Sequence, residues 1–260
     1  MNWKTIEVEF LEEGVVLVTL NRPDVLNAVD DTMRLEFTSL IPVLQKEEVR
    51  GVVFTGAGRA FCAGVDISRF EQDWSDRYFA GENYDLLDFF DALENLPKPV
   101  FAAINGAATG AGILLALACD IRVASEAGRV GFREHQLGLV PGLGGSVRLV
   151  RLLGLSRAKE IYFQKKLVGA QELHRLGLVA RVTTPETLIP ETLEWARELA
   201  ARAPLALARA KMLFNGVLDR THREGIEAEN EALEASIRTE DHKEGVAAFR
   251  ERRRPVFKGR

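Results

Sequence analysis

The sequence predicts an α/β protein whose functional loops follow short buried strands. Two apolar segments, residues 52–54 and 100–104, run directly into glycine-rich turns at Gly56 and Gly106. A short strand that is apolar at every position is typical of a parallel sheet covered on both faces. Two such strand-to-turn units indicate two loops that converge at one end of a sheet. Beyond Leu188 the pattern is helical throughout, so a charged helical region is expected to follow the core.

The composition is that of a globular protein with an ample core. The chain has 260 residues, of which 47% are hydrophobic, and its formal net charge is −4. This length suits one compact domain, or one domain with an appendage. The acidic balance gives no electrostatic reason to expect a nucleic-acid partner. The uncharged segment 99–119 is interrupted by Asn105, Thr109 and glycines, so no membrane span is expected.

The cysteines and the start of the chain point to the cytoplasm. Cys62 and Cys119 lie in glycine-rich or apolar segments, and residues 1–10 carry charges spaced through them. An export peptide needs an apolar stretch of about 7–15 residues, so we expect residues 1–10 to be mature structure. Reduced, buried thiols in a cytoplasmic protein are the expected state of both cysteines.

The first elements follow from alternation and capping signals. Residues 6–10 alternate, and residues 15–20 follow a turn, which predicts a β-hairpin. Asp30 or Asp31 can cap a helix with one apolar face, and Pro42 should kink or end that helix. The apolar positions are Met33, Phe37, Leu40, Ile41 and Leu44.

Residues 67–96 are the least regular part of the core region and are rich in aromatic side chains. Helices with a mobile cover over a pocket are expected there. Phe89 and Phe90 fit ordinary helix packing. The better candidates for contacting a substrate are the aromatic residues that stand among charges, Trp74, Tyr78 and Tyr84.

The last third of the chain reads as helices separated by glycine and proline, with one strand at residues 179–182. Its charge predicts a packing or oligomerisation module. The basic tail 250–260 fits a solvated end or contact with a phosphate. The expected helices span residues 147–153, 156–163, 170–176, 189–203, a stretch that opens at Pro204, and 223–237.

Several common site motifs are absent. Residues 56–58 and 110–112 follow strands, but Phe61 and Leu115 stand where a dinucleotide-binding fingerprint needs its third glycine. No glycine run leads into the Gly-Lys-Ser/Thr of a phosphate-binding loop. The four histidines share no metal-ligand spacing, so no metal site is expected. Ser146 lacks the flanking pattern of a hydrolase nucleophile.

Glu134 is the carboxylate in the sequence most suited to chemistry. It is flanked by two stretches without charge, residues 101–118 and 136–146. Burial there would raise its proton affinity and let it act as a base. The segment is expected to be extended, with His135 pointing to the opposite face. A salt bridge is the alternative, which spacing alone favours slightly; its candidate partners are Arg133, Arg148 and Arg151.

Small residues at 106–112 precede a short apolar helix, whose unpaired N–H groups can face an anion. A helix start that can face an anion, together with one carboxylate, favours carbonyl chemistry. Further motifs are found at residues 20–28, 55–66, 98–100, 105–106 with 110–112, 119–120, 137–145, 244–245 and 257–259. Through them the sequence resembles the crotonase, or enoyl-CoA hydratase/isomerase, family over essentially its whole length.

The resemblance implies a crotonase-like spiral of repeated strand-strand-helix units over residues 1–200, which carries the acyl-CoA site. Residues 201–260 would form a C-terminal helical trimerisation region. The implied assembly is a homotrimer or a hexamer built as a dimer of trimers.

By the same resemblance, the backbone N–H groups of Val65 and Ala111 form an oxyanion hole for an acyl-CoA thioester. One donor aimed at a developing enolate oxygen can lower the barrier by roughly 3 kcal/mol. Coenzyme A enters as part of the substrate, and no separate cofactor is implied. The implied substrate-binding residues are Leu26, Ala28, Ala63, Asp66, Ile67, Ser68, Gly110 and Lys258, the last from its own or a neighbouring subunit.

One departure from the family pattern bears on the reaction. Typical hydratases of this family use two glutamates, one at the position of Glu134 and one where this chain has Leu114. A single carboxylate over an oxyanion hole can remove the α proton of a thioester and return it at the γ carbon. The pattern therefore resembles that of delta-3 to delta-2 enoyl-CoA isomerases.

Two alternatives remain open. One is a hydratase, hydrolase or dehalogenase of the family, with a second acid or base recruited from His135, Glu71, Asp73, Asp76 or Tyr84. The other is a non-catalytic acyl-CoA or RNA-binding scaffold. Both glycine loops and Glu134 are retained, which argues against the scaffold, and the acidic balance argues against RNA.

Overall fold

The computed structural model describes residues 3–70 and 84–260, and its larger sheet has six strands. The strand order is β1-β2-β3-β5-β7-β10. β1 and β2 form the predicted antiparallel hairpin, and every later pair is parallel. The strands are β1 (Ile6–Phe10), β2 (Val15–Leu20), β3 (Gly51–Gly56), β5 (Val100–Ile104), β7 (Ile121–Ser125) and β10 (Arg181–Thr183).

A second, four-stranded sheet continues the main strands after sharp turns. β3 leads into β4 (Ala60–Cys62), β5 into β6 (Ala107–Thr109), and β7 into β8 (Arg129–Gly131). The sheet order is β4-β6-β8-β9, with β9 at Val168–Gly169. These strand-strand repeats, separated by helices, confirm the predicted spiral architecture. Residues 60–62, 107–109, 121–125 and 129–131 are strands that the sequence pattern does not predict.

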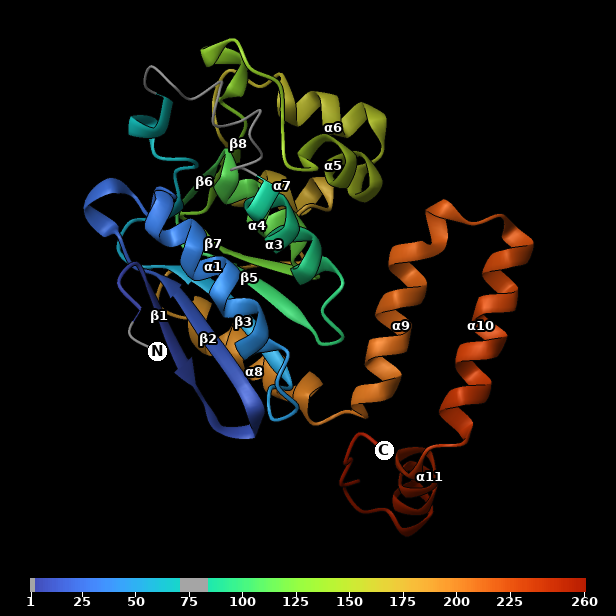
Figure 1. The fold of residues 1–260 in the computed structure, drawn as a ribbon. Helices are drawn as coiled ribbons and strands as arrows, with labels where there is room; N and C mark the ends of the chain where they lie inside the picture. Colours follow the sequence, from blue (N-terminus) through green and yellow to red (C-terminus); the bar gives the residue numbers. More distant parts are fainter. Residues whose placement is uncertain (1–2, 71–83) are drawn as a thin grey trace.

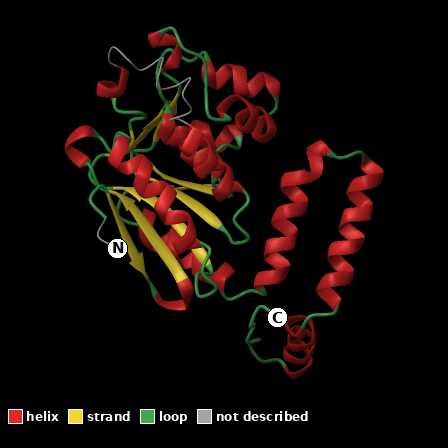
Figure 2. Ribbon diagram, viewed as in Figure 1, coloured by secondary structure: helices red, strands yellow, loops and turns green. Residues whose placement is uncertain are grey.

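Helices cover both faces of the larger sheet (Figures 1 and 2). On one face Phe37 and Phe89 stack with ring centroids 4.4 Å apart and close over β3. On the other face α8 packs against Val53 and Phe101. The helices of the core are α1 (Asp31–Leu44), α3 (Tyr84–Glu94), α4 (Ala111–Ala118), α5 (Gly145–Leu153), α6 (Leu155–Tyr162), α7 (Ala170–Leu176) and α8 (Leu188–Ala200).

The first helix begins directly after a capping residue that the sequence predicts. The Asp30 carboxylate accepts from the Met33 N–H at 2.8 Å and caps α1, as one of the two predicted capping residues. Pro42 lies inside the last turn, and the helix ends two residues later. Phe89 and Phe90 are buried, as predicted. The strand predicted at 179–182 is displaced to β10, because the N–H groups of Leu178 and Val179 close the turn after α7.

The chain after α8 is helical, as predicted, and extends away from the sheets (Figure 1). α9 (Pro204–Gly216) and α10 (His222–Ile237) contain no buried residue. The buried carboxylate of Asp241, in α11 (Glu240–Glu251), accepts from the N–H groups of Lys258 and Gly259 at 2.7 and 2.8 Å. The C-terminal tail is thereby folded back onto the start of α11.

Cys62 and Cys119 are unpaired and buried, which confirms their predicted state. Burial raises the pKa of each thiol to about 12. In the two described stretches of the chain, no helix has both the length and the hydropathy needed to cross a membrane.

Candidate active site

Three neighbouring parallel strands end at the same edge of the smaller sheet. Cys62 of β4 pairs with Ala108 of β6, and β6 pairs in turn with β8. Val65 lies three residues after β4, Ala111 two residues after β6 and Glu134 three residues after β8. Since paired strands lie about 4.8 Å apart, the sheet brings these three predicted catalytic positions to one place.

Two glycines let the turns after β4 and β6 touch. Gly64 has φ +105° and Gly110 has φ +51°, values that side-chain-bearing residues rarely adopt. A Cβ atom on Gly64 would lie 3.1 Å from the Thr109 carbonyl oxygen and 3.5 Å from the Ala111 nitrogen. The two glycines therefore allow a close backbone approach between two parts of the same chain.

The backbone pairing around Val65 leaves its N–H free to face that contact. Val29 donates to the Gly64 carbonyl at 2.8 Å, and Asp66 donates to the Val29 carbonyl at 3.0 Å. In a parallel bridge of this kind, the residue between the two bonded ones directs its own N–H to the other side. Within residues 3–70 and 84–260, no backbone carbonyl accepts from Val65.

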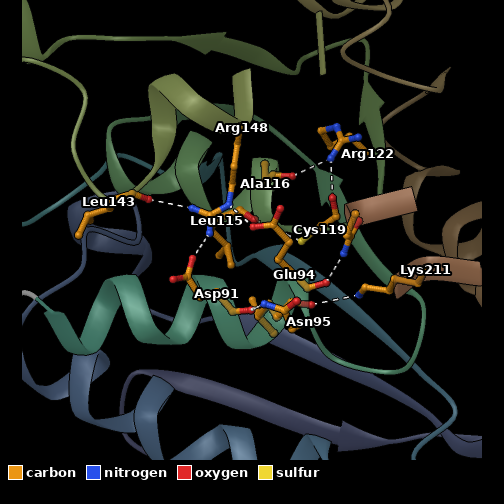
Figure 3. A network of polar contacts seen from close by, with 12 residues as sticks. Asp91, Glu94, Asn95, Leu115, Ala116, Cys119, Arg122, Leu143, Arg148 and Lys211 are labelled. Atoms are coloured by element: carbon orange, nitrogen blue, oxygen red, sulfur yellow. Dashed lines mark hydrogen bonds and ion pairs between the residues drawn. The ribbon is translucent and has the colours of Figure 1, made fainter. Parts of the chain in front are cut away.

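The second N–H belongs to Ala111, the first residue of α4, where helical N–H groups have no partner within the helix. The positive end of the helix dipole adds to its pull on an anion. At the other end of α4, the buried guanidinium of Arg122 donates to the carbonyls of Ala116 and Cys119 at 3.1 and 2.6 Å (Figure 3). Arg122 thus fixes the helix that presents the Ala111 N–H.

Glu134 begins the 3-10 turn η4 (Glu134–Leu137), so the prediction of an extended segment is wrong. The turn forms because Leu139 donates to the Glu134 carbonyl at 2.9 Å and Gly138 adopts φ +71°. His135 therefore follows Glu134 around a turn and does not take the opposite face of a strand. The Glu134 carboxylate accepts from the Arg133 backbone N–H at 2.8 Å.

Burial raises the pKa of the Glu134 carboxyl, although backbone N–H groups and His135 oppose the shift. The salt bridge that spacing slightly favours is not formed with Arg133, Arg148 or Arg151. Arg148 is held by Asp91 and Glu94 of α3, as Figure 3 shows. Arg151 is engaged by Asp219. No arginine of the described chain therefore neutralises Glu134 by direct contact, and its carboxylate keeps the character of a base.

Tyr162 belongs to the surroundings of Glu134 and was not singled out from the sequence. Its ring lies between Phe132 and His135, with centroids 5.4 and 5.7 Å away. Burial and the charge of Glu134 raise the pKa of the Tyr162 phenol. An aromatic residue at the end of a distant helix gives no local signal of this contact.

Leu114 lies one turn into α4 and is buried, with 3% of its surface exposed. A Cβ atom on Gly145 would meet the Leu114 Cδ2 atom at 2.3 Å. The leucine side chain therefore fills the space beside the glycine turn that precedes α5. At the position where the family resemblance implies a second glutamate in hydratases, this chain therefore has a buried apolar side chain.

The other predicted binding residues fall into two groups. Ala63 donates to the Leu26 carbonyl at 3.0 Å. Residues 26–29, which we call the CoA-binding strip, therefore run beside residues 63–66, which we call the Val65 turn. Ala28 precedes Val29 in that strip, Gly110 precedes Ala111, and Asp66, Ile67 and Ser68 continue from Val65. Ile67 is 72% exposed.

Lys258 is not brought to this edge. It lines a cavity of about 280 Å³ with Gln45, Lys98 and Pro99, before the start of β5. The candidate site lies after the other end of β5, where β6 and α4 follow, so Lys258 belongs to the opposite end of that strand. Of the possible second acids, Glu71, Asp73 and Asp76 lie outside the described residues, as do the predicted aromatic contacts Trp74 and Tyr78.

Comparisons with known proteins agree with this architecture. The family model described as enoyl-CoA hydratase/isomerase matches residues 11–260. A short-chain-enoyl-CoA hydratase from Clostridium acetobutylicum is 37% identical over 247 residues, which cover 94% of each chain. The mitochondrial enoyl-CoA hydratase of Pongo abelii is 35% identical over 246 residues, 94% of this chain and 83% of its own.

A solved structure shows the same fold. The crystal structure of an enoyl-CoA hydratase from Bacillus anthracis superimposes with a TM-score of 0.94 at 35% identity, covering 99% of this chain and 100% of the other. A family match over nearly the whole chain and a shared fold at this identity leave one conclusion. The chain belongs to the enoyl-CoA hydratase/isomerase, or crotonase, family of enzymes.

Proposed function

We propose that this enzyme shifts a double bond in an enoyl-CoA thioester, using Glu134 as the one base. One observation carries the proposal. Two backbone N–H groups without a partner in the described chain and one half-buried carboxylate follow the ends of β4, β6 and β8, while Leu114 stands in place of a second acid. Other carboxylates that the structure describes are engaged or lie elsewhere, as Asp91 and Glu94 do with Arg148.

The reaction needs no water. Glu134 takes the proton from the carbon next to the thioester carbonyl, and the negative charge moves to the carbonyl oxygen. The N–H groups of Val65 and Ala111 stabilise that oxygen, each by roughly 3 kcal/mol. The protonated Glu134 then returns the proton at the γ carbon, which leaves a conjugated 2-enoyl thioester. Burial of Glu134 suits both steps, because it brings the two protonation states closer in energy.

Hydration of a 2-enoyl-CoA is the second candidate, and the names of the relatives favour it: those from Clostridium acetobutylicum and Pongo abelii are both called hydratases. Hydration requires an acid and a base around a water molecule. With Leu114 apolar, the second group would have to come from His135, Tyr84 or one of Glu71, Asp73 and Asp76. Isomerisation needs only the groups already in place, so it is the leading proposal.

The rest of the substrate would lie along the strip beside the Val65 turn. Backbone groups of Leu26, Ala28 and Ala63, and those of residues 66–68, suit the CoA arm, and Gly110 leaves room for the thioester. Coenzyme A is part of the substrate, and no separate cofactor takes part in the proposed steps. The buried, unpaired cysteines suit a cytoplasmic enzyme.

We further propose a homotrimer or a dimer of trimers, with residues 201–260 as its helical contact region. Large apolar side chains exposed on this region support the proposal, among them Phe214, Leu233 and Phe249. Lys258 lies far from the site of its own chain. It would therefore meet the CoA phosphates of a neighbouring subunit.

Replacing Glu134 by glutamine should lower kcat for a 3-enoyl-CoA by roughly 10²- to 10⁴-fold, because glutamine cannot accept the proton. Formation of the conjugated thioester is followed by its ultraviolet absorbance. Glu126→Gln, in the exposed turn between β7 and β8, is the matched control and should keep full activity. Unchanged turnover in Glu134→Gln would rule out the proposed mechanism.

The pH dependence of activity should show a base whose pKa is raised by partial burial. Because burial raises the pKa of Glu134, kcat/KM should fall on acidification with a midpoint above the ordinary glutamate value of 4.5. Activity is lost as pH falls through the raised pKa, since only the carboxylate form accepts a proton. Circular dichroism at each pH excludes unfolding as the cause. A midpoint at or below 4.5 would contradict a raised pKa of Glu134.

Leu114→Glu should add the missing second acid. Hydration of a 2-enoyl-CoA should rise by about 10-fold or more over the matched Leu114→Gln variant, which has the same size but no titratable group. The readout is loss of the conjugated absorbance in water. If the wild type already hydrates as fast as Leu114→Glu, the second acid lies elsewhere and hydration becomes the better proposal.

Lys258→Ala should raise KM for enoyl-CoA by up to about fivefold, the effect of losing one exposed ion pair of about 1 kcal/mol. KM for the matching pantetheine thioester, which lacks the nucleotide phosphates, should not change. Lys243→Ala, on the exposed surface of α11, is the control. An equal change in KM for both thioesters would remove Lys258 from the phosphate site.

A further inference from the structure

Arg22 lies where the CoA-binding strip meets the Val65 turn, and its guanidinium touches both. Nη1 donates to the Ala28 carbonyl at 2.5 Å and lies 3.0 Å from Asp66 Oδ2. Nη2 lies 3.3 Å from Asp30 Oδ2. The three charged side chains are only 16–28% exposed. One planar cation therefore joins three segments of the chain at a site largely shielded from water.

Each of these contacts is made by a residue next to the Val29–Val65 bridge, which orients the Val65 N–H. Ala28 immediately precedes Val29, and Asp66 immediately follows Val65, the two residues that form the parallel bridge. Asp30 also accepts from the Met33 N–H, which fixes it to the start of α1. Arg22 thus anchors both sides of the bridge to a rigid helix.

The strip held by Arg22 is strained. Leu26 and Asn27 have φ values of 55° and 57°, a left-handed conformation that costs a residue such as leucine about 1–2 kcal/mol and that asparagine tolerates better. It persists because surrounding contacts over-determine it. The Asn27 amide donates to the Ala57 and Ala60 carbonyls at 2.9 and 2.8 Å, while its oxygen accepts from the Arg22 N–H at 2.9 Å.

We infer that Arg22 is a positioning residue that couples the CoA-binding strip to the Val65 N–H. Binding of the CoA arm and orientation of the oxyanion donor then both depend on the contacts of Arg22 with Ala28, Asp30 and Asp66, which we call the clasp. This inference rests on the proposed function. In this role Arg22 acts through Ala28 and Asp66 and does not touch the reacting atoms. The groups around the guanidinium are two carboxylates and a carbonyl, which a planar fork can bridge together.

The chemistry of the clasp makes lysine an informative replacement. Lysine keeps the positive charge between Asp30 and Asp66, but its ammonium is a point donor and cannot span three acceptors in fixed directions. Arg22→Lys therefore removes the geometry and keeps the charge. Asp66→Asn removes the negative charge that pairs with Arg22 and leaves the shape of the side chain almost unchanged.

The test uses the full-length enzyme and two probes. Free CoA reports binding along the strip and is measured by calorimetry. Acetoacetyl-CoA reports the oxyanion hole, because its bound enolate has a near-ultraviolet absorbance that the unbound keto form lacks. Arg181→Lys is the control, since Arg181 forms an exposed ion pair with Glu191 at 3.6 Å on β10.

Arg22→Lys is expected to lose about 10-fold or more of the enolate signal and of kcat, with a smaller loss of free-CoA affinity. Asp66→Asn should show the same pattern, and the double variant should be no worse than Arg22→Lys, because both remove one link. The thermal midpoints and the Arg181→Lys control should stay near wild type.

The outcomes separate the two proposals. Wild-type enolate absorbance in Arg22→Lys and Asp66→Asn would overturn the clasp and leave the proposed function intact. The absence of any enolate signal in the wild type would instead overturn the oxyanion hole itself. If Arg22→Lys does not fold, Asp66→Asn decides. Equal loss in Arg181→Lys would show a general effect of charge and would also overturn the inference.

Discussion

The contact between the turns at Gly64 and Gly110 is the constraint on which the site depends. A Cβ atom on either glycine would press tightly on the other turn, at 3.1 Å for Gly64 and 3.3 Å for Gly110, and both glycines have positive φ values that disfavour side chains. The approach sets Val65 and Ala111 side by side. Pairing of β4 with β6, and of β6 with β8, holds the turns in this relation and adds Glu134 from the third strand.

Much of the larger sheet could be predicted because its signals are local. The hairpin, the apolar cores of β3 and β5, and α1 with its Asp30 cap follow from alternation, uniform burial and capping. The smaller sheet could not. Its β6 is Ala-Ala-Thr and its β8 is Arg-Val-Gly, too short to show a period. These strands form because distant segments pair with them.

The same division applies to the candidate site. Glu134 could be found from the sequence because the stretches 101–118 and 136–146 lack charge. The expected extended backbone and the favoured salt bridge were both wrong. A left-handed glycine, Gly138, closes a turn after Glu134, and the acids of α3 engage Arg148. Those acids lie on a helix far earlier in the chain, where the spacing around Glu134 carries no information about them. Tyr162 was missed for the same reason. The donors of Val65 and Ala111 are main-chain groups, so no residue type marks them, and only the family resemblance pointed to them.

The free N–H of Val65 has a further consequence. Most buried amide hydrogens are protected from exchange with solvent by a hydrogen bond. Val29, its partner in the isolated bridge, donates to Gly64, whereas Val65 donates to no carbonyl of the described backbone. A donor kept unpaired for an oxyanion is also a donor that water can reach whenever the site is empty. The Val65 amide, which would serve the chemistry, is thus expected to exchange its hydrogen with solvent faster than its neighbours do.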